Sequence, residues 1–275
     1  MDGTASAWVA WKKYGDTAEY IPADDRKVLP AYVSDHTDMS NLEVYITDFC
    51  YPKEVLLDLE KKCKKLVVLD HHVTQKDDIE SVHNHVYGIE KSGAMLAWEY
   101  FNPGITAPVA IQYVSDSDTW THAMPDYEIV NAYIYKTDAN FAFSDFDKLV
   151  KQLEDPKSFE DIKVIGKTLR DIHMASVNKY AEKAEEIDFA GHKVWAVNAP
   201  SEIKSELGRK LAERNGKFGI VYYYSEGKWR FSMRSLPDFD VSVIAQKFGG
   251  GGHKNAAAIH IASESPAISI LQNLK

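Results

Sequence analysis

The strongest constraint on the fold is a strand–helix–strand pattern in the first quarter of the chain. Residues 43–48 and 66–70 are short runs rich in apolar and β-branched side chains, and each run ends in an aspartate. Between them, Pro52 begins a segment with helical spacing, where a proline in the first turn costs nothing. Such runs are typical of buried parallel strands. The pattern therefore predicts a parallel α/β sheet whose strand ends bring polar side chains to one edge.

The rest of the chain predicts a long helix followed by a second α/β region. Residues 159–187 repeat apolar side chains at three- and four-residue intervals, as an amphipathic helix does. Residues 218–224 and 228–234 alternate around Glu226-Gly227, which predicts a hairpin. The other expected elements are helices over 4–14, 93–101, 107–115, 201–216 and 241–248, and strands over 18–21, 193–198 and 257–261.

Acidic side chains and histidines gather at the predicted strand ends. The triplet Asp70-His71-His72 follows the second apolar run directly. The other acids at the ends of apolar segments are Asp2, Asp48, Asp116 and Asp118. Any single acid of this kind is most often a helix cap or a solvated turn, and the triplet alone is compatible with a polar loop. Several carboxylates at one edge repel one another, however, and a divalent cation with oxygen and imidazole ligands removes that cost.

A glycine run near the C-terminus predicts a phosphate site. Four glycines are followed by three side chains that donate hydrogen bonds, in the order Gly249, Gly250, Gly251, Gly252, His253, Lys254 and Asn255. Glycine permits positive φ and lets backbone N–H groups approach an anion. A flexible linker is the alternative. The run lies between a helix capped by Asp240 and the strand at 257–261, which favours the phosphate site.

Composition narrows the class of protein. The net charge of −9 argues against tight, non-specific binding to long duplexes, although a short or single-stranded substrate remains compatible with it. No apolar run approaches the roughly 18 residues of a membrane span, and the first residues lack the basic-then-apolar pattern of a signal peptide. The two cysteines form no disulfide framework, which favours a reducing, cytoplasmic compartment.

In these residues the chain resembles the DHH-family phosphoesterases with a DHH-associated C-terminal domain, the group of RecJ-like exonucleases and nanoRNases. The matching positions, in family order, are Asp2-Gly3, Asp48, Asp70-His71-His72, Ser92-Gly93-Ala94, Asp116, Arg234-Ser235 and the run from Gly249 to Ala257. The resemblance implies a hydrolase with two manganese ions, or magnesium or another divalent ion. It also implies a parallel-sheet DHH domain at 1–140, a helical linker at 141–187 and a smaller α/β substrate-binding domain at 188–275.

The resemblance also implies roles for individual residues. The metal ligands carried over are Asp2, Asp48, His71 and Asp116, with Asp48 as the natural bridging ligand. Asp70 is expected to orient His71, and His72 to contact substrate or protonate a leaving oxygen, with a buried structural histidine as the alternative. The expected substrate-binding residues are Arg234, Gly250, Gly251, Gly252, His253 and Asn255. A plain surface arginine is the alternative for Arg234.

The chain departs from the family at its first motif, His-x-Asp-x-Asp-Gly. It begins Met1-Asp2-Gly3 and so holds only the last two residues of that motif. One metal site is therefore nearly complete, and its partner has lost about two ligands. Either the true start lies upstream or the chain is a degenerate member. We expect Asp2 to lie on a frayed terminus and one manganese to bind weakly.

Three functions remain open at this point. The leading prediction is hydrolysis of phosphodiester bonds in short oligonucleotides or linear dinucleotides. The second is a small-molecule phosphatase or polyphosphate hydrolase, and the third is a catalytically impaired protein that binds a phosphate ligand. The expected partner is a short single-stranded nucleic acid or a small phosphoester, with no membrane. A homodimer is one compatible state of assembly.

Overall fold

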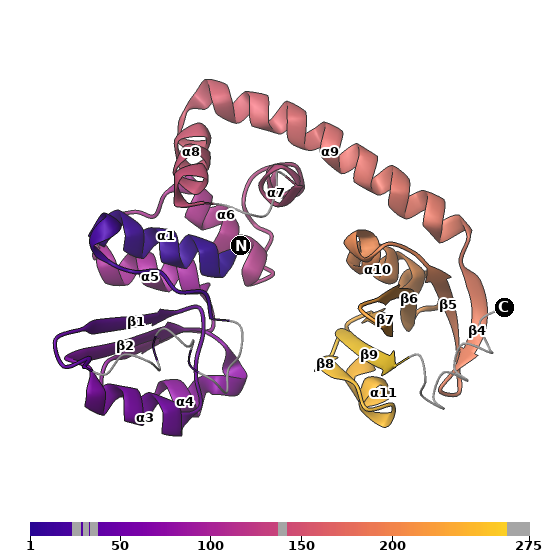
Figure 1. Cartoon of the computed structure of the whole chain (residues 1–275). Coiled ribbons are helices and arrows are strands. Elements are labelled where there is room, and N and C mark those ends of the chain that lie inside the picture. The colour runs from indigo at the N-terminus through magenta and orange to yellow at the C-terminus, as the bar shows by residue number, and fades with distance from the viewer. Residues whose placement is uncertain (24–28, 30–32, 34–37, 137–141, 263–275) are drawn as a thin grey trace. The chain divides into compact units, whose positions relative to one another are not determined.

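The structure is a computed structural model that describes residues 1–23, 29, 33, 38–136 and 142–262. It divides into two compact units, Met1–Arg170 and Asp171–Lys275, which are described one at a time below (Figure 1). The boundary between the units falls within a long helix, α9 (Pro156–Glu182). That helix lies in the segment 141–187 that was expected to join the two domains. No helix among the described residues combines the length and apolarity that crossing a bilayer requires.

The first unit is built on a three-stranded parallel sheet in the order β1-β2-β3. The strands are β1 (Glu43–Thr47), β2 (Lys65–Asp70) and β3 (His85–Tyr87). In the register, Thr47 lies beside Leu69, so the two strands end within one residue of each other. The carboxyl ends of β1 and β2 therefore form one edge, as the strand–helix–strand pattern predicted.

Helices cover both faces of this sheet (Figure 1). Alternate residues of a strand point to opposite faces. Leu66 and Val68 pack with the helix α3 (Lys53–Lys62), whereas Val67 and Leu69 pack into a core on the other face. Other helices in the described part of this unit are α1 (Asp2–Tyr14), α4 (Lys76–Ile79), α5 (Gly93–Phe101), α6 (Val109–Asp118), α7 (Tyr127–Lys136) and α8 (Phe143–Glu154). Residues of α1, α5 and α6 line the core with Val67 and Leu69.

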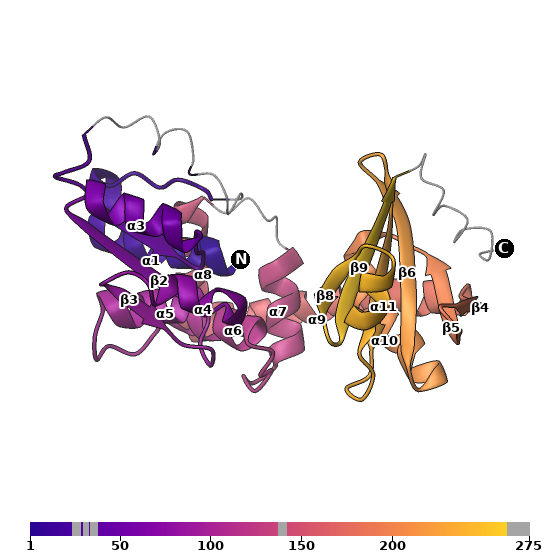
Figure 2. The same cartoon turned by 90° about the horizontal axis from the view of Figure 1, so that it is seen from below.

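The second unit is a six-stranded mixed sheet in the order β4-β5-β6-β7-β9-β8. Its strands are β4 (Glu185–Phe189), β5 (His192–Asn198), β6 (Phe218–Ser225), β7 (Lys228–Ser235), β8 (Gly251–His253) and β9 (Ala256–Ala262). The helix α10 (Lys204–Asn215) packs with the end of α9 in one core. The helix α11 (Val241–Lys247) packs in a second core with residues of β7 and β9 (Figure 2).

The predicted fold class is confirmed, and so is the β6–β7 hairpin. Glu226 and Gly227 have φ values of 52° and 74°, as a tight two-residue hairpin turn requires. Two expectations are wrong. Residues 18–21 form no strand, and the Tyr20 hydroxyl donates to the carbonyl of Gly15. The helix expected over 159–187 ends at Glu182, and Ile187 lies in β4, where alternation replaces helical spacing.

Candidate functional site

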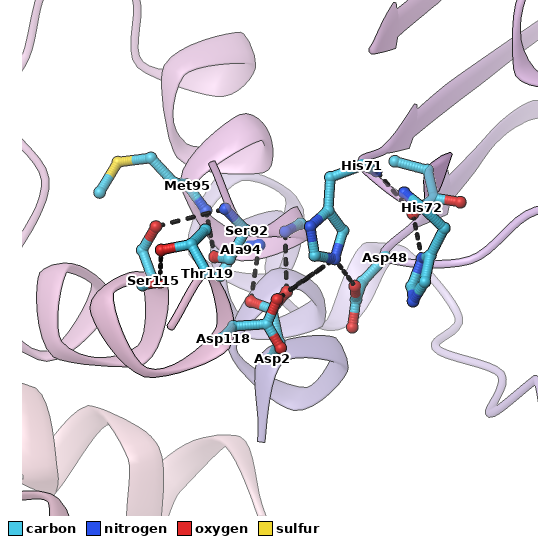
Figure 3. Close-up of polar contacts among 12 residues, drawn as sticks. Asp2, Asp48, His71, His72, Ser92, Ala94, Met95, Ser115, Asp118 and Thr119 are labelled. Carbon is cyan, nitrogen blue, oxygen red and sulfur yellow. Dashed lines mark hydrogen bonds and ion pairs between the residues drawn. The ribbon is translucent and has the colours of Figure 1, made fainter. Parts of the chain in front are cut away.

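The ends of β1 and β2 position one aspartate, Asp48, and one histidine, His71. Asp48 follows β1, and its backbone N–H donates to the carbonyl of Leu69 at 2.9 Å. Its φ of 55° is left-handed, a conformation that aspartate tolerates better than most residues do. This turn directs the Asp48 carboxylate toward His71, which follows the last residue of β2 (Figure 3).

His71 is the centre of an acidic cluster. Its Nε2 atom lies 3.3 Å from Oδ1 of Asp48, 3.3 Å from Oδ2 of Asp118 and 3.9 Å from Oδ2 of Asp2 (Figure 3). Asp2, His71 and Asp118 each offer a ligand atom within 4.8 Å of the others. We name Asp2, Asp48, His71 and Asp118 the His71 cluster. Together they offer three carboxylates and one imidazole, a donor set that suits manganese or magnesium.

Asp2 is held firmly, which corrects the expectation of a frayed terminus. Its side chain is buried, and its two carboxylate oxygens accept hydrogen bonds from the N–H groups of Gly93 at 2.7 Å and Ala94 at 2.9 Å. These groups open α5, whose N-cap Ser92 accepts a hydrogen bond from the N–H of Met95 (Figure 3). A helix N-terminus stabilises a carboxylate. The start of α1 is therefore tied to the site by α5.

Asp118, and not Asp116, joins the His71 cluster. Both lie on α6, but residues two apart on a helix point in nearly opposite directions. The buried Asp116 carboxylate accepts hydrogen bonds from the N–H groups of Ala123 at 2.8 Å and Met124 at 3.2 Å, so it supports the loop after α6. The structure thus does not bring the expected ligand Asp116 to the cluster, and helical geometry is the signal that separates the two acids.

Asp70 holds the ring of His72 and not that of His71. The Asp70 carboxylate is fully buried, and its Oδ1 atom lies 2.7 Å from Nδ1 of His72. The same oxygen accepts the backbone N–H of His71 at 2.7 Å. Asp70 therefore orients the His72 imidazole directly and His71 only through the backbone. The His72 side chain is 47% exposed, so a buried structural role does not describe it.

Burial and crowding of charge shift the pKa values in the cluster. Burial raises the pKa of Asp48 to about 7, although the hydrogen bond to His71 opposes this, and the nearby charge of Asp2 adds to it. The hydrogen bond to Asp48 raises the pKa of His71 to about 9. Burial, followed by the charge of Asp2, raises the pKa of Asp118. The hydrogen bond to Asp70 raises the pKa of His72. Protons thus offset the crowded negative charge, as a bound cation would.

In the second unit, Arg234 is half-buried and braced from several directions. Its Nη1 atom donates to the Ser232 hydroxyl at 3.1 Å and to the Met233 carbonyl at 2.9 Å, and its Nη2 atom donates to the Ser205 hydroxyl at 3.0 Å. Burial lowers its pKa. Its Nε atom is buried and has no partner among the residues that the structure describes. These contacts fit a positioned guanidinium better than a plain surface arginine.

The glycine run forms an edge strand. A Cβ on Gly250 would lie 2.2 Å from the carbonyl oxygen of Ala258, and one on Gly252 would lie 2.5 Å from that of Ala256. Both glycines are therefore needed where this segment lies against β9. Gly251 faces open space, and Gly251, Gly252 and His253 are exposed on β8. The glycine run is therefore not a flexible linker.

Asn255 has an internal role that its sequence context did not suggest. Its Nδ2 atom donates to the Ser235 hydroxyl at 2.9 Å and to the carbonyls of Leu236 at 2.7 Å and Phe239 at 3.2 Å. Its amide hydrogens thus brace the connection between β7 and α11. This use of the amide differs from the expected donation to a phosphate.

Comparison with known proteins gives matches in both halves of the chain. Residues 161–275 match the DHHA1 domain. The chain is 30% identical to the uncharacterized protein R106 of Acanthamoeba polyphaga mimivirus over 94% of its own length and 64% of that protein. It is 33% identical to the oligoribonuclease NrnB of Bacillus subtilis over 129 residues, which are 46% of this chain and 28% of NrnB. The chain thus spans less than two thirds of either relative.

Solved structures share the fold at low sequence identity. The pGpG-specific phosphodiesterase PggH of Vibrio cholerae is 15% identical, with a TM-score of 0.51 over 99% of this chain and 94% of that one. RecJ of Thermus thermophilus, solved in complex with Mn²⁺, is 14% identical, with a TM-score of 0.51 over 97% of this chain and 48% of RecJ. These similarities concern the fold alone.

Proposed function

The chain belongs to the DHH family of phosphoesterases, and from this membership we propose that it is a divalent-cation-dependent phosphodiesterase acting on short oligonucleotides or linear dinucleotides. The observation that carries the proposal is the His71 cluster at the ends of β1 and β2. The similarity to NrnB, which is named an oligoribonuclease, supports a short RNA as substrate.

The donor set fits one divalent cation, for which we propose manganese. Asp2, Asp48, His71 and Asp118 would hold it, because each of the three carboxylates has an oxygen 3.3 to 3.9 Å from Nε2 of His71. When bound, the cation would screen the charge of the phosphate and lower the pKa of a water molecule. Asp70 is committed to the backbone of His71 and the ring of His72, so we do not include it among the ligands.

His72 is proposed as the residue that moves a proton. Asp70 fixes its Nδ1 atom, which leaves Nε2 as the atom that donates to the leaving oxygen. The raised pKa of His72 keeps a larger share of the ring protonated near neutral pH. For the second unit we propose substrate binding, with Arg234 on β7 and the exposed His253 on β8 as contacts to phosphate oxygens.

The test is digestion of a graded series of end-labelled oligoribonucleotides, from the dinucleotide upward, with manganese and with EDTA. We expect cleavage only with manganese, and the highest kcat/KM for the shortest members. Equal cleavage of long strands would contradict the preference for short substrates. Release of phosphate from small monoesters without cleavage of any oligonucleotide would favour a small-molecule phosphatase instead.

The two acids of α6 give a matched pair of variants. Asp118→Asn should weaken manganese binding by more than about 100-fold, since even partners outside the ligand set cost 10–100-fold when removed. Asp116→Asn should leave manganese affinity unchanged but lower the free energy of unfolding by about 1.5–3 kcal/mol, because it weakens two charged hydrogen bonds. Calorimetric titration and thermal unfolding measure the two effects. The reverse outcome would return Asp116 to the ligand set.

Manganese affinity should rise with pH. The cation needs a neutral His71 and an ionised Asp48, whereas the metal-free site holds protons because both pKa values are raised, to about 9 and about 7. Binding therefore displaces protons, and affinity should rise by up to about tenfold per pH unit for each proton displaced. Titrations between about pH 6 and pH 8.5, in buffers of different ionisation heat, measure the number released. A pH-independent affinity with no proton release would contradict this competition.

A further inference from the structure

The loop after α6 presents a tryptophan to solvent close to the His71 cluster. Trp120 is 73% exposed, more than any other large hydrophobic side chain in the described part of the chain. It follows Asp118 by two residues, so the two Cα atoms lie no more than about 7.6 Å apart. This spacing places the backbone of the loop beside the helix end that carries Asp118, at a distance that a nucleotide bound at the cluster could span.

Aromatic rings support this indole from one side. The ring centroids of Trp120 and His122 are 5.5 Å apart, and His122 stacks on Tyr127 at 4.2 Å with an interplanar angle of 18°. The Tyr127 hydroxyl donates to the Ser117 hydroxyl at 3.2 Å. Trp120, His122 and Tyr127 thus form a row of aromatic contacts, here named the Trp120 platform. The Trp120 ring is tilted by 41° from that of His122, and the Tyr127 ring is fixed to α6.

The backbone holds the platform in a costly conformation. Trp120 and His122 have φ values of 57° and 52°, in the left-handed region that side chains with a Cβ rarely adopt. The carbonyl of Asp116 accepts the N–H of Thr121 at 3.1 Å, and its carboxylate accepts that of Ala123 at 2.8 Å. The buried Asp116 therefore fixes this loop by more than one hydrogen bond, and the loop in turn keeps the apolar ring of Trp120 in water. Such strain is typical of positions that contact a ligand.

We propose that the Trp120 platform stacks a nucleobase of the substrate beside the phosphate held at the His71 cluster. The inference rests on the proposed phosphodiesterase function and adds a binding surface for the base. A stacking face suits every base, so it supports affinity without sequence preference. The neighbouring acids Asp118 and Asp126 disfavour an anionic membrane surface as the partner of this indole.

Fluorescence tests the platform without turnover. AMP has the base and phosphate but no diester, and ribose 5-phosphate lacks the base. With magnesium present, AMP should quench part of the tryptophan emission, and ribose 5-phosphate should not. Both variants lack the indole that reports by fluorescence, so their AMP affinity is measured by calorimetric titration. Trp120→Phe should retain AMP affinity, whereas Trp120→Ala should weaken it by about tenfold, as loss of one base–aromatic stack does. Equal AMP affinity in Trp120→Ala and the unchanged protein would overturn the proposal.

Kinetics separate the platform from the proposed function. Trp120→Ala should raise KM by about tenfold for a short oligoribonucleotide but leave KM unchanged for the same strand with abasic residues. Ile105→Ala, which removes another exposed apolar side chain from the same unit, should change neither value. An equal rise of KM on both strands would show a structural effect and overturn the platform. If the unchanged protein cleaves no strand, the phosphodiesterase function fails, while the AMP titration still decides whether Trp120 binds a base.

Discussion

His71→Ala should lose manganese-dependent hydrolysis by more than about 100-fold in kcat/KM while the fold survives. Nε2 of the His71 imidazole lies 3.3 to 3.9 Å from an oxygen of each of the three carboxylates of the cluster. Its removal takes away the nitrogen ligand and leaves Asp2, Asp48 and Asp118 to repel one another without it. The measurement is the rate of dinucleotide cleavage, with manganese affinity from calorimetry and the unfolding temperature from circular dichroism.

His83→Ala is the matched control for this variant. His83 is an exposed histidine of the same unit, and its backbone N–H, not its ring, donates to the Glu60 carboxylate. Its replacement should leave both manganese affinity and turnover unchanged. Full turnover by His71→Ala, with manganese still bound tightly, would remove His71 from the site and with it the proposed cation centre.

Gly93→Ala should reduce activity by about 100-fold or more, although position 93 carries no side chain to react. A Cβ there would lie 2.4 Å from Cβ of Asp48 and 2.7 Å from its Cα. Either Asp48 or the start of α5 must move, and α5 also holds Asp2 through the N–H groups of Gly93 and Ala94. Overpacking of this kind costs about 1–3 kcal/mol in stability as well.

The control for this glycine is Gly88→Ala, just before the same helix. A Cβ at position 88 would meet only the tip of the Leu96 side chain at 3.3 Å, which can shift by a few tenths of an ångström. We expect nearly unchanged cleavage and manganese affinity for Gly88→Ala. If Gly93→Ala behaves in the same way, close approach of α5 to Asp48 does not organise the site.

The sheet edge was predictable because it depends on local patterns. Two apolar runs with an intervening helix fix parallel strands, and parallel strands end at one edge. The placement of Asp48 and His71 at this edge follows from that pattern alone. Asp2 was predicted as a ligand but not as a buried one, because its partners Gly93 and Ala94 lie 91 and 92 residues away. Such pairing is decided by tertiary packing, which no local pattern reports.

The α6 acids and the glycine run show a second limit of sequence patterns. Asp116 and Asp118 are the same residue type, and only their angle around the helix axis separates ligand from loop support. Likewise, Gly250 and Gly252 permit the close approach of β9, while an exposed run of the same letters was expected to bind phosphate. Residue type and spacing predict the available chemistry, and packing decides which members of a run perform it.

The hydrogen bonds from the first two amides of α5 to the Asp2 carboxylate decide how an inactive variant with an intact fold should be designed. Alanine at position 2 would remove the acceptor of the first two amides of α5 as well as a ligand of the cation. A loss of activity in that variant would therefore not distinguish a lost ligand from a disturbed helix. In the described part of the chain, the recognised contacts of the His71 ring are with the carboxylates of the cluster and not with the first amides of α5. Loss of activity in His71→Ala therefore reports on the cation site and not on damage to that helix. An asparagine at position 2 would keep an acceptor for one of the two amides and so separate helix capping from ligation.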